Sequence, residues 1–595
     1  MSRSNTASVE SPWPGLLAAS FVAVCYFLYA HYPAFVEPYC TNNDAPQHLL
    51  WMFDVNWAEP FYAETSGRIQ PWGYLWLNRF FLLFLDPILL SYMGVLLSLL
   101  LTVNYSFLAF RQFFPTALAL AAALFAGHLA YAPSVGYFSR AFCVPTIAIF
   151  THYFLLRQAK GVALSWLVGA LFYPPALLVC LGIFGLHVPW FLYQWWRSGL
   201  FLGDFKVAKL LDNRQVINEV ESTDDREKMT DRSDRPFSSP QSFSSTLLSP
   251  LLILGVGAFL SLAIVLAKSA ELRMDPWIGP FVSAKVITTD AEFGSGGRVN
   301  FRHELKTTTP AMIKYTLRRN LRWSKQDWPY WLGGIIFLFS AWWWRKQKIA
   351  RFDAYLIAFV LSASILHGLA KELVPLLFLP DRFFRYPGHF LGGMILARLL
   401  FILPLRWQTV ATTFALTGFV FLYGPYIKGI YRRSLDQFKS TGPVFEELVK
   451  KPEGSMVAAP PYMADLIPVF AEQSVLISNE SAHALYFTNY RKYIDVRWRD
   501  YIRAYCAKID EPAVLTDFIR RYRIDYLILD PPRFEKRDFH VFQPYVDVYK
   551  SYTKDVPIEE FLVTQIPEQL QKKLTNNYYI VNANELLKWL ESMEQ

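Results

Sequence analysis

The chain has 595 residues, of which 53% are hydrophobic and 17% aromatic, and its mean hydropathy is +0.20. Apolar runs of membrane-spanning length recur through its first two-thirds, which indicates a multi-pass membrane protein. The formal charge of +9 fits basic loops that face an anionic membrane surface, so nucleic acid is not an expected partner. Five cysteines without a CxxC or a Cys/His cluster exclude a disulfide framework and a zinc motif.

Residues 1–425 are expected to form an α-helical transmembrane domain with about eleven spans. The expected spans are 15–30, 87–110, 116–130, 142–156, 162–172, 176–193, 247–266, 331–344, 355–369, 391–403 and 410–423. The expected external loops are 31–86, 131–141, 267–330 and 370–390, and a charged linker is expected over 196–246. A helix over 72–85 is expected to lie at the membrane interface because it is short and contains Asn78 and Arg79.

Basic residues predict the orientation. The short basic loops 157–160 and 345–351 and the linker 196–246 are expected to face the cytoplasm, which places the external loops and the C-terminal region on the opposite side. Lys428, Arg432 and Arg433 follow the last span and go against this assignment. One miscounted span would reverse the side of the tail.

Residues 426–595 are expected to form a soluble, extracytoplasmic α/β domain. Strands are predicted near 456–459, 474–478 and 524–530, and helices over 462–473 and 511–523. No GxGxxG or GxxxxGK[ST] motif appears here, so the usual nucleotide-binding loops are absent from the sequence.

A helical break is predicted at Tyr173-Pro174-Pro175, because a double proline cannot continue a helix at membrane depth. Such a break is more typical of a cavity than of a lipid-facing wall.

This layout resembles the GT-C class of integral-membrane glycosyltransferases. The motifs that carry the resemblance are Asn43-Asp44 with Gln47-His48 after the first span, and Pro380-Asp381-Arg382-Phe383-Phe384-Arg385-Tyr386-Pro387 in an external loop. Within the class, the similarity is to enzymes related to protein mannosyltransferases and aminoarabinose transferases. It implies a polyprenyl-phosphate sugar donor, an acceptor that is a protein, lipid or glycan, a hexosyl or pentosyl transfer that inverts the anomeric centre, and a place in the cell (inner) membrane.

The resemblance implies that Asp44 is the general base or orienting carboxylate for the acceptor. A carboxylate partly shielded by lipid has a raised pKa and accepts a proton near neutral pH. The alternative is that Asn43 or Asp44 only caps a helix. His48 lies four residues later on the same helical face, where it would orient Asp44, bind a metal or contact the phosphate, or remain a polar surface residue.

Departure of a lipid phosphate needs fixed positive charge. Arg382 and Arg385 lie one helical turn apart and converge on one anion if that turn is helical, and Arg140 is a further external cation at membrane depth. The alternative for each is that it extends toward lipid head groups. These three arginines are the predicted donor-phosphate site.

Asp290 and Glu292 stand before a glycine run in the long external loop, where they suggest a gating or ion-binding loop or, equally, an exposed turn. The loop 132–140 contains no acid and the tail has no Trp-Trp-Asp-Tyr-Gly, unlike the metal-dependent oligosaccharyltransferases. No cofactor is therefore expected to be required, although a divalent cation is compatible with the sequence. The sequence does not identify which metal ion the protein would bind.

Other functions fit the same spans. A lipid or polysaccharide transporter or flippase, or a polysaccharide polymerase, would also use broken helices and buried charges. The few intramembrane charges and the lack of visible half-to-half symmetry argue against a transporter, and the C-terminal domain argues against a polymerase. A catalytically inactive GT-C-like scaffold is a third alternative.

Overall fold

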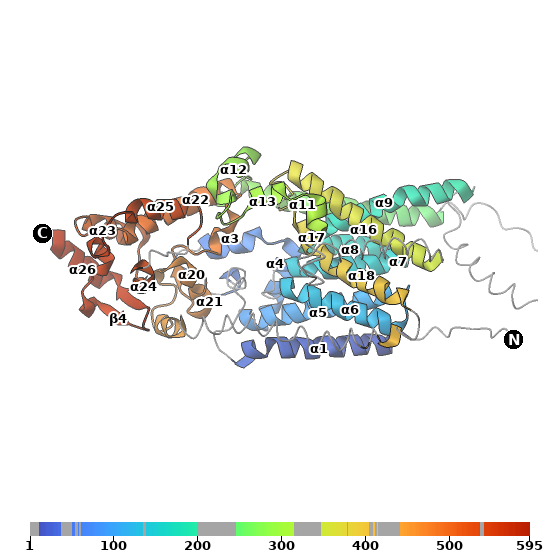
Figure 1. Cartoon of the computed structure of the whole chain (residues 1–595), viewed down its shortest axis with the longest axis horizontal. Coiled ribbons are helices and arrows are strands. Elements are labelled where there is room, and N and C mark those ends of the chain that lie inside the picture. The colour runs from blue at the N-terminus through green and yellow to red at the C-terminus, as the bar shows by residue number, and fades with distance from the viewer. Residues whose placement is uncertain are drawn as a thin grey trace, which may run out of the picture.

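The structure is a computed structural model of the whole chain (Figure 1). It describes residues 11–36, 50–53, 57–58, 61–134, 139–198, 245–314, 347–377, 379–403, 408–410, 413, 441–535 and 541–594. The helices before residue 404 are α1 (Trp13–Val36), η1 (Leu50–Met52), α3 (Phe61–Ile69), α4 (Trp72–Phe81), α5 (Pro87–Phe110), α6 (Thr116–Ser134), η2 (Ser139–Phe142), α7 (Cys143–Leu155), α8 (Ala159–Phe172), α9 (Pro174–Ser198), α11 (Ser245–Met274), α12 (Ala284–Thr289), η4 (Ala291–Phe293), α13 (Phe301–Lys306), α16 (Gln347–Glu372), α17 (Arg382–Arg385) and α18 (Pro387–Ile402).

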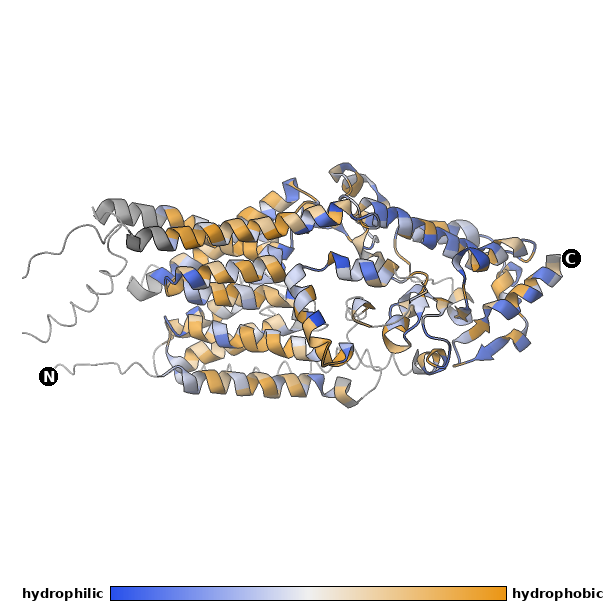
Figure 2. Ribbon diagram, turned by 180° about the vertical axis from the view of Figure 1, so that it is seen from behind, coloured by the Kyte–Doolittle hydropathy of each residue, from blue (hydrophilic) through white to orange (hydrophobic). Residues whose placement is uncertain are grey.

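Four of the described helices are long and apolar enough to cross a membrane. The segments are Trp13–Tyr32, Pro87–Phe110, Pro250–Met274 and Arg351–Glu372. On α11, Phe259 and Leu266 are 71% and 69% exposed, and the bundle is coloured apolar along its length (Figure 2). Soluble proteins rarely expose so much contiguous apolar surface, so we assign lipid as the solvent of this face.

Shorter apolar helices cover Thr116–Tyr131, Ala159–Phe172 and Pro174–Pro189, where short spans were expected. The expected span 331–344 and most of the expected span 410–423 lie outside the described residues. The total of about eleven spans therefore remains a prediction.

The expected helical break is present at Tyr173. The residue has left the helical conformation, with φ −154° and ψ 89°, and it ends α8, while α9 begins at Pro174. Proline is well placed at the start of a helix because its missing N–H would have no partner there.

Small residues let the helices of the bundle approach closely. At Gly393 of α18, an added Cβ would lie 2.7 Å from Ala126 Cβ and 2.9 Å from the Ala122 carbonyl oxygen on α6. Helix pairs in membranes associate largely through such close packing, because lipid and side chains are equally apolar. Gly393 therefore fixes the spacing of α18 and α6.

A buried ion pair joins α16 to α18. Arg398 Nε and Nη2 lie 2.8 and 3.1 Å from the two carboxylate oxygens of Asp353. Arg398 is fully buried and Asp353 is 6% exposed. Each charge in this interior depends on the other, because an unpaired buried charge is costly.

The C-terminal elements form a five-stranded sheet of order β2-β1-β3-β5-β4. The strands are β1 (Met456–Ala458), β2 (Ser474–Val475), β3 (Tyr526–Leu529), β4 (Gln571–Lys573) and β5 (Tyr579–Asn582). β1 pairs parallel with β2 and β3, and β5 pairs antiparallel with β3 and β4. The helices are α20 (Pro461–Ala464), α21 (Ile467–Phe470), η5 (Ser481–Ala484), α22 (Thr488–Tyr505), α23 (Pro512–Tyr522), α24 (Pro531–Glu535), α25 (Tyr545–Thr553), η6 (Ile558–Glu560), η7 (Leu562–Thr564), η8 (Glu568–Leu570) and α26 (Ala583–Glu594).

The three predicted strands and the helix over 511–523 are confirmed. The single helix expected over 462–473 is wrong: two short helices, α20 and α21, occupy this stretch, and Pro468 lies in the first turn of the second. Proline fits that first turn but not a helix interior, which explains the division. The boundary at 426 and the solubility of this domain remain predictions.

Segments that connect the apolar helices pack against the C-terminal elements. Figure 1 shows α3, α12 and α13 between the helical bundle and the sheet-containing part. Phe61 of α3 stacks on Tyr493 of α22 with ring centroids 3.7 Å apart, and the Val282 amide donates to the Tyr486 carbonyl at 2.9 Å. α3 and the segment around Val282 are thus joined to the C-terminal part by an aromatic contact and a backbone contact, respectively.

Candidate functional site: an arginine cluster at the broken helix

The turn that contains Arg382 and Arg385 is helical. These residues begin and end α17, and the Arg385 amide donates to the Asp381 carbonyl at 2.7 Å. Pro387 starts the next helix directly afterwards. The condition under which the two arginines were expected to converge is therefore met.

All three predicted phosphate-binding arginines gather around one ring, that of Tyr386. The guanidinium carbons of Arg382, Arg385 and Arg140 lie 4.9, 5.7 and 5.9 Å from its centroid. Arg382 also donates a hydrogen bond to the Tyr386 hydroxyl. Arg140 comes from η2, far away in sequence, so the fold brings separate segments of the chain to the same place. We call these four residues the arginine cluster.

The cluster lies against the broken helix. Tyr386 makes an edge-on contact with Tyr173, with centroids 6.1 Å apart at 76°. Tyr173 is the residue between α8 and α9, and it lies within electrostatic reach of Arg382. The proline break thus borders a charged site rather than lipid alone.

The positive charge of the cluster acts on Tyr386 itself. Burial raises the pKa of a tyrosine, but Arg382, Arg140 and Arg385 outweigh this and hold the pKa of Tyr386 below its ordinary value. The lowered pKa of the Tyr386 hydroxyl therefore reports a positive electrostatic potential at this position. The same potential favours a phosphate placed beside the guanidiniums.

Two acids adjoin the cluster: Asp381, which stands in the quoted motif but was given no role there, and Glu304, which no motif contained. Asp381 lies 3.4 Å from Arg385 and 3.9 Å from Arg382. Glu304 of α13 comes from the segment between α11 and α16. Burial, followed by repulsion from Asp381, raises the pKa of Glu304 to about 7, although Arg385 and Arg382 act in the opposite sense.

These acids are incompletely satisfied within the described part of the chain. Glu304 Oε2 and Asp381 Oδ1 are buried there without a hydrogen-bond partner. Because Glu304 holds a proton over part of the neutral range, the charge of the cluster changes with pH near neutrality. Tyr386 and Asp381 stood beside the arginines in the sequence, whereas no local pattern marked Glu304.

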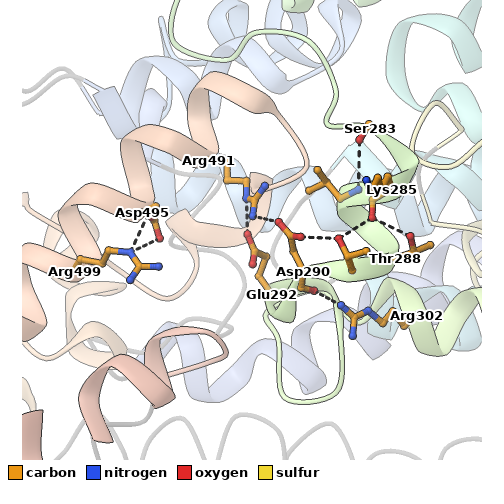
Figure 3. A network of polar contacts seen from close by, with 11 residues as sticks. Ser283, Lys285, Thr288, Asp290, Glu292, Arg302, Arg491, Asp495 and Arg499 are labelled. Atoms are coloured by element: carbon orange, nitrogen blue, oxygen red, sulfur yellow. Dashed lines mark hydrogen bonds and ion pairs between the residues drawn. The ribbon is translucent and has the colours of Figure 1, made fainter. Parts of the chain in front are cut away.

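Asp290 and Glu292, the suggested gating or ion-binding pair, both contact Arg491 of α22 (Figure 3). Arg302 also donates to the Asp290 carbonyl at 2.6 Å. Partial burial favours protonation, but hydrogen bonds from Thr289 and Arg491 hold the pKa of Asp290 below its ordinary value. The two acids thus share the guanidinium of Arg491 as a partner.

The contacts of Asp290 and Glu292 with Arg491 hold the loop that contains these acids against α22. Binding of an ion by the two acids stays a prediction, as does gating by this loop. In the described part of the chain, no group of three or more His, Cys, Asp or Glu side chains has the arrangement needed to hold a metal.

Asp44 and His48, the predicted catalytic pair, lie outside the described residues. Their roles therefore remain predictions. The described part of the site is the arginine cluster with Asp381 and Glu304.

No protein-family model and no curated protein sequence matches this chain. Among solved structures, ArnT from Cupriavidus metallidurans in the apo state is similar at 12% identity, over 96% of this chain and 98% of that one, with a TM-score of 0.44. The oligosaccharyltransferase of Archaeoglobus fulgidus, in complex with Zn and sulfate, is similar at 12% identity, over 90% of this chain and 71% of that one, with a TM-score of 0.42. The same archaeal enzyme, AglB, bound to an inhibitory peptide and a dolichol-phosphate, gives 10% identity, over 90% of this chain and 72% of that one, and a TM-score of 0.40.

These neighbours are GT-C glycosyltransferases, the class that the sequence resembles. Their identities and TM-scores are low.

Proposed function

We propose that this protein is a membrane glycosyltransferase that moves a sugar from a polyprenyl-phosphate donor to an acceptor on the extracytoplasmic side. The observation that carries the proposal is the convergence of Arg140, Arg382 and Arg385 around Tyr386. Three guanidiniums held at the mouth of a bundle of apolar helices suit a ligand with a phosphate head and a long apolar tail.

In this proposal the cluster acts on the leaving group. As the acceptor nucleophile bonds to the anomeric carbon, the bond from that carbon to the phosphate oxygen breaks, and the phosphate keeps the electron pair. The arginines stabilise the charge that grows on the phosphate, an effect that is strongest where fixed donors are already in place. Asp44 takes the proton of the acceptor, and direct displacement inverts the anomeric centre.

Glu304 adjusts the charge of the site. When Glu304 is protonated, the neighbouring acid Asp381 still opposes phosphate binding. When Glu304 ionises, it adds a second negative charge. Donor binding should therefore be stronger on the acidic side of about pH 7. The pH dependence of binding distinguishes this site from three arginines on an open surface.

The test is binding of undecaprenyl phosphate to the purified full-length protein by native mass spectrometry, with the neutral alcohol undecaprenol as comparator. Wild type should prefer the phosphate, and Arg382→Gln should weaken phosphate binding by about tenfold or more, since charge-assisted hydrogen bonds are lost. Arg385→Lys keeps the charge but loses the planar fork, and should weaken it less than Arg385→Gln.

Arg499→Gln is the matched control. It removes a half-exposed arginine of α22 that pairs with Asp495 within the same helix. This variant should bind the phosphate like wild type, because surface pairs of this kind contribute little. Equal binding of phosphate and alcohol by wild type would refute the proposed role of the cluster.

A further inference from the structure

A cavity lies in the C-terminal sheet domain, with a volume of about 620 Å³. It opens where β1 and β3 end. Pro460 follows β1, and Asp530 and Pro531 follow β3, and all three line the cavity. The volume falls in the range of small-molecule sites.

The sheet topology favours a ligand site at this position. From β1 the chain continues to β2 on one flank, whereas β3 lies on the other flank of β1 and pairs parallel with it. The connections thus diverge between the carboxyl ends of β1 and β3. Ligands of parallel α/β sheets bind in the crevice at such a switch point.

Hydrogen bonds hold polar side chains of the cavity in place. The Tyr462 hydroxyl donates to Asp530 and lies 3.1 Å from the Tyr578 hydroxyl. Tyr505 donates to the carbonyls of Ala458 and Ile528, at 3.1 and 3.0 Å, which fixes its ring against the strand ends. Tyr462 and Tyr505, which line the cavity, are thus held by hydrogen bonds, and the Asp530 carboxylate lies beside Tyr462.

The side chains at the exposed rim of the cavity include both hydrogen-bond donors and hydrogen-bond acceptors. Gln571 supplies an amide, Glu568 a carboxylate and Lys573 an ammonium group, and Tyr579 adds a further ring. Sugar hydroxyls both donate and accept, so a lining with amide, carboxylate and phenol groups matches them. Aromatic rings supply apolar faces for the C–H surface of a sugar ring.

The charge of the lining disfavours a phosphate. Asp530 stands at the strand end where nucleotide-binding folds receive their phosphates, and Glu568 adds a second carboxylate against the single lysine. The sequence also lacks the glycine-rich loops that hold phosphates.

We propose that the cavity at the ends of β1 and β3 binds an uncharged saccharide of one or two rings. This site is separate from the arginine cluster, and the inference does not depend on the proposed transfer reaction. It gives the C-terminal domain a binding role of its own.

The experiment is saturation-transfer difference NMR on the full-length protein, with a panel of neutral mono- and disaccharides built from glucose, mannose, galactose and N-acetylglucosamine. Glucose 1-phosphate and inorganic phosphate serve as anionic probes. At least one neutral saccharide should bind at concentrations up to about 10 mM, and the anions should not compete. Glu568→Ala, a change at the exposed rim, should weaken that binding, and Asp530→Ala should weaken it by about tenfold through loss of a charge-assisted hydrogen bond.

Glu585→Ala, at an exposed position of α26 outside the cavity, is the control and should bind like wild type. No binding by any neutral saccharide would overturn the proposal. Displacement of the bound saccharide by the anionic probes would also overturn it. So would saccharide binding that neither Glu568→Ala nor Asp530→Ala weakens. Because the readout is binding, it separates this inference from failure of sugar transfer.

Discussion

Replacement of Glu304 by glutamine should remove a pH dependence of stability that the wild type shows. Burial and the neighbouring Asp381 raise the pKa of Glu304 from its ordinary 4.5 to about 7. A difference of this size corresponds to a penalty of at most roughly 3 kcal/mol on the ionised carboxylate in the folded protein, since solvent screens its exposed part.

The sign follows from proton binding. The folded protein holds the Glu304 proton more tightly than the unfolded chain, so stability falls as pH rises. The contribution is fully present below about pH 4.5, is lost progressively through about pH 7, and does not change further above it. Glu304→Gln is neutral throughout, so it should gain stability relative to wild type over this window.

The assay is thermal unfolding in lipid nanodiscs, followed by tryptophan fluorescence, for both proteins at about pH 5 and about pH 8. The midpoint of the variant should exceed that of wild type by more at the higher pH. Glu446→Gln removes an exposed glutamate and should follow wild type. Parallel pH profiles of Glu304→Gln and wild type would refute the burial argument.

Two further predictions concern the helical bundle. Arg398→Met should destabilise the fold by about 3–5 kcal/mol, because it leaves the Asp353 carboxylate buried without its partner. Adding Asp353→Leu to this variant should restore most of the lost stability. Thermal unfolding compares the single and double variants, and equal stabilities of the two would contradict the prediction. Gly393→Ala should cost about 1–3 kcal/mol, because its Cβ meets backbone of the neighbouring helix. Gly185→Ala on α9, where an added Cβ meets nothing within 4 Å, should be neutral or stabilising, and equal losses at the two glycines would show that packing is not the cause.

Much of the arginine cluster was predictable from local sequence. Arg382 and Arg385 have the spacing of one helical turn between prolines, and Tyr386 follows them directly. Arg140 was found by its depth beside an apolar span, and the proline pair after Tyr173 marked the broken helix. In each case the signal is a short-range pattern that the membrane setting makes informative.

Contacts between distant segments were not predictable. Glu304 owes its altered pKa to tertiary burial beside Asp381, and nothing in its own neighbourhood shows this. The acids Asp290 and Glu292 both contact Arg491, about two hundred residues further along, and their sequence showed no sign of this partner. Charge pairing across such distances depends on docking of the loop on α22, which one sequence does not reveal.

The most direct test of the proposed activity is transfer of labelled sugar from a membrane lipid extract by purified protein. Wild type should transfer the label, and Arg382→Gln should lose most of the activity through poorer stabilisation of the departing phosphate. Asp44→Asn, nearly isosteric and still able to cap a helix, should lose it while remaining folded. Full activity of Asp44→Asn would reduce Asp44 to a helix cap, and no transfer by wild type from a complete donor pool would contradict the glycosyltransferase proposal and favour a transporter or scaffold.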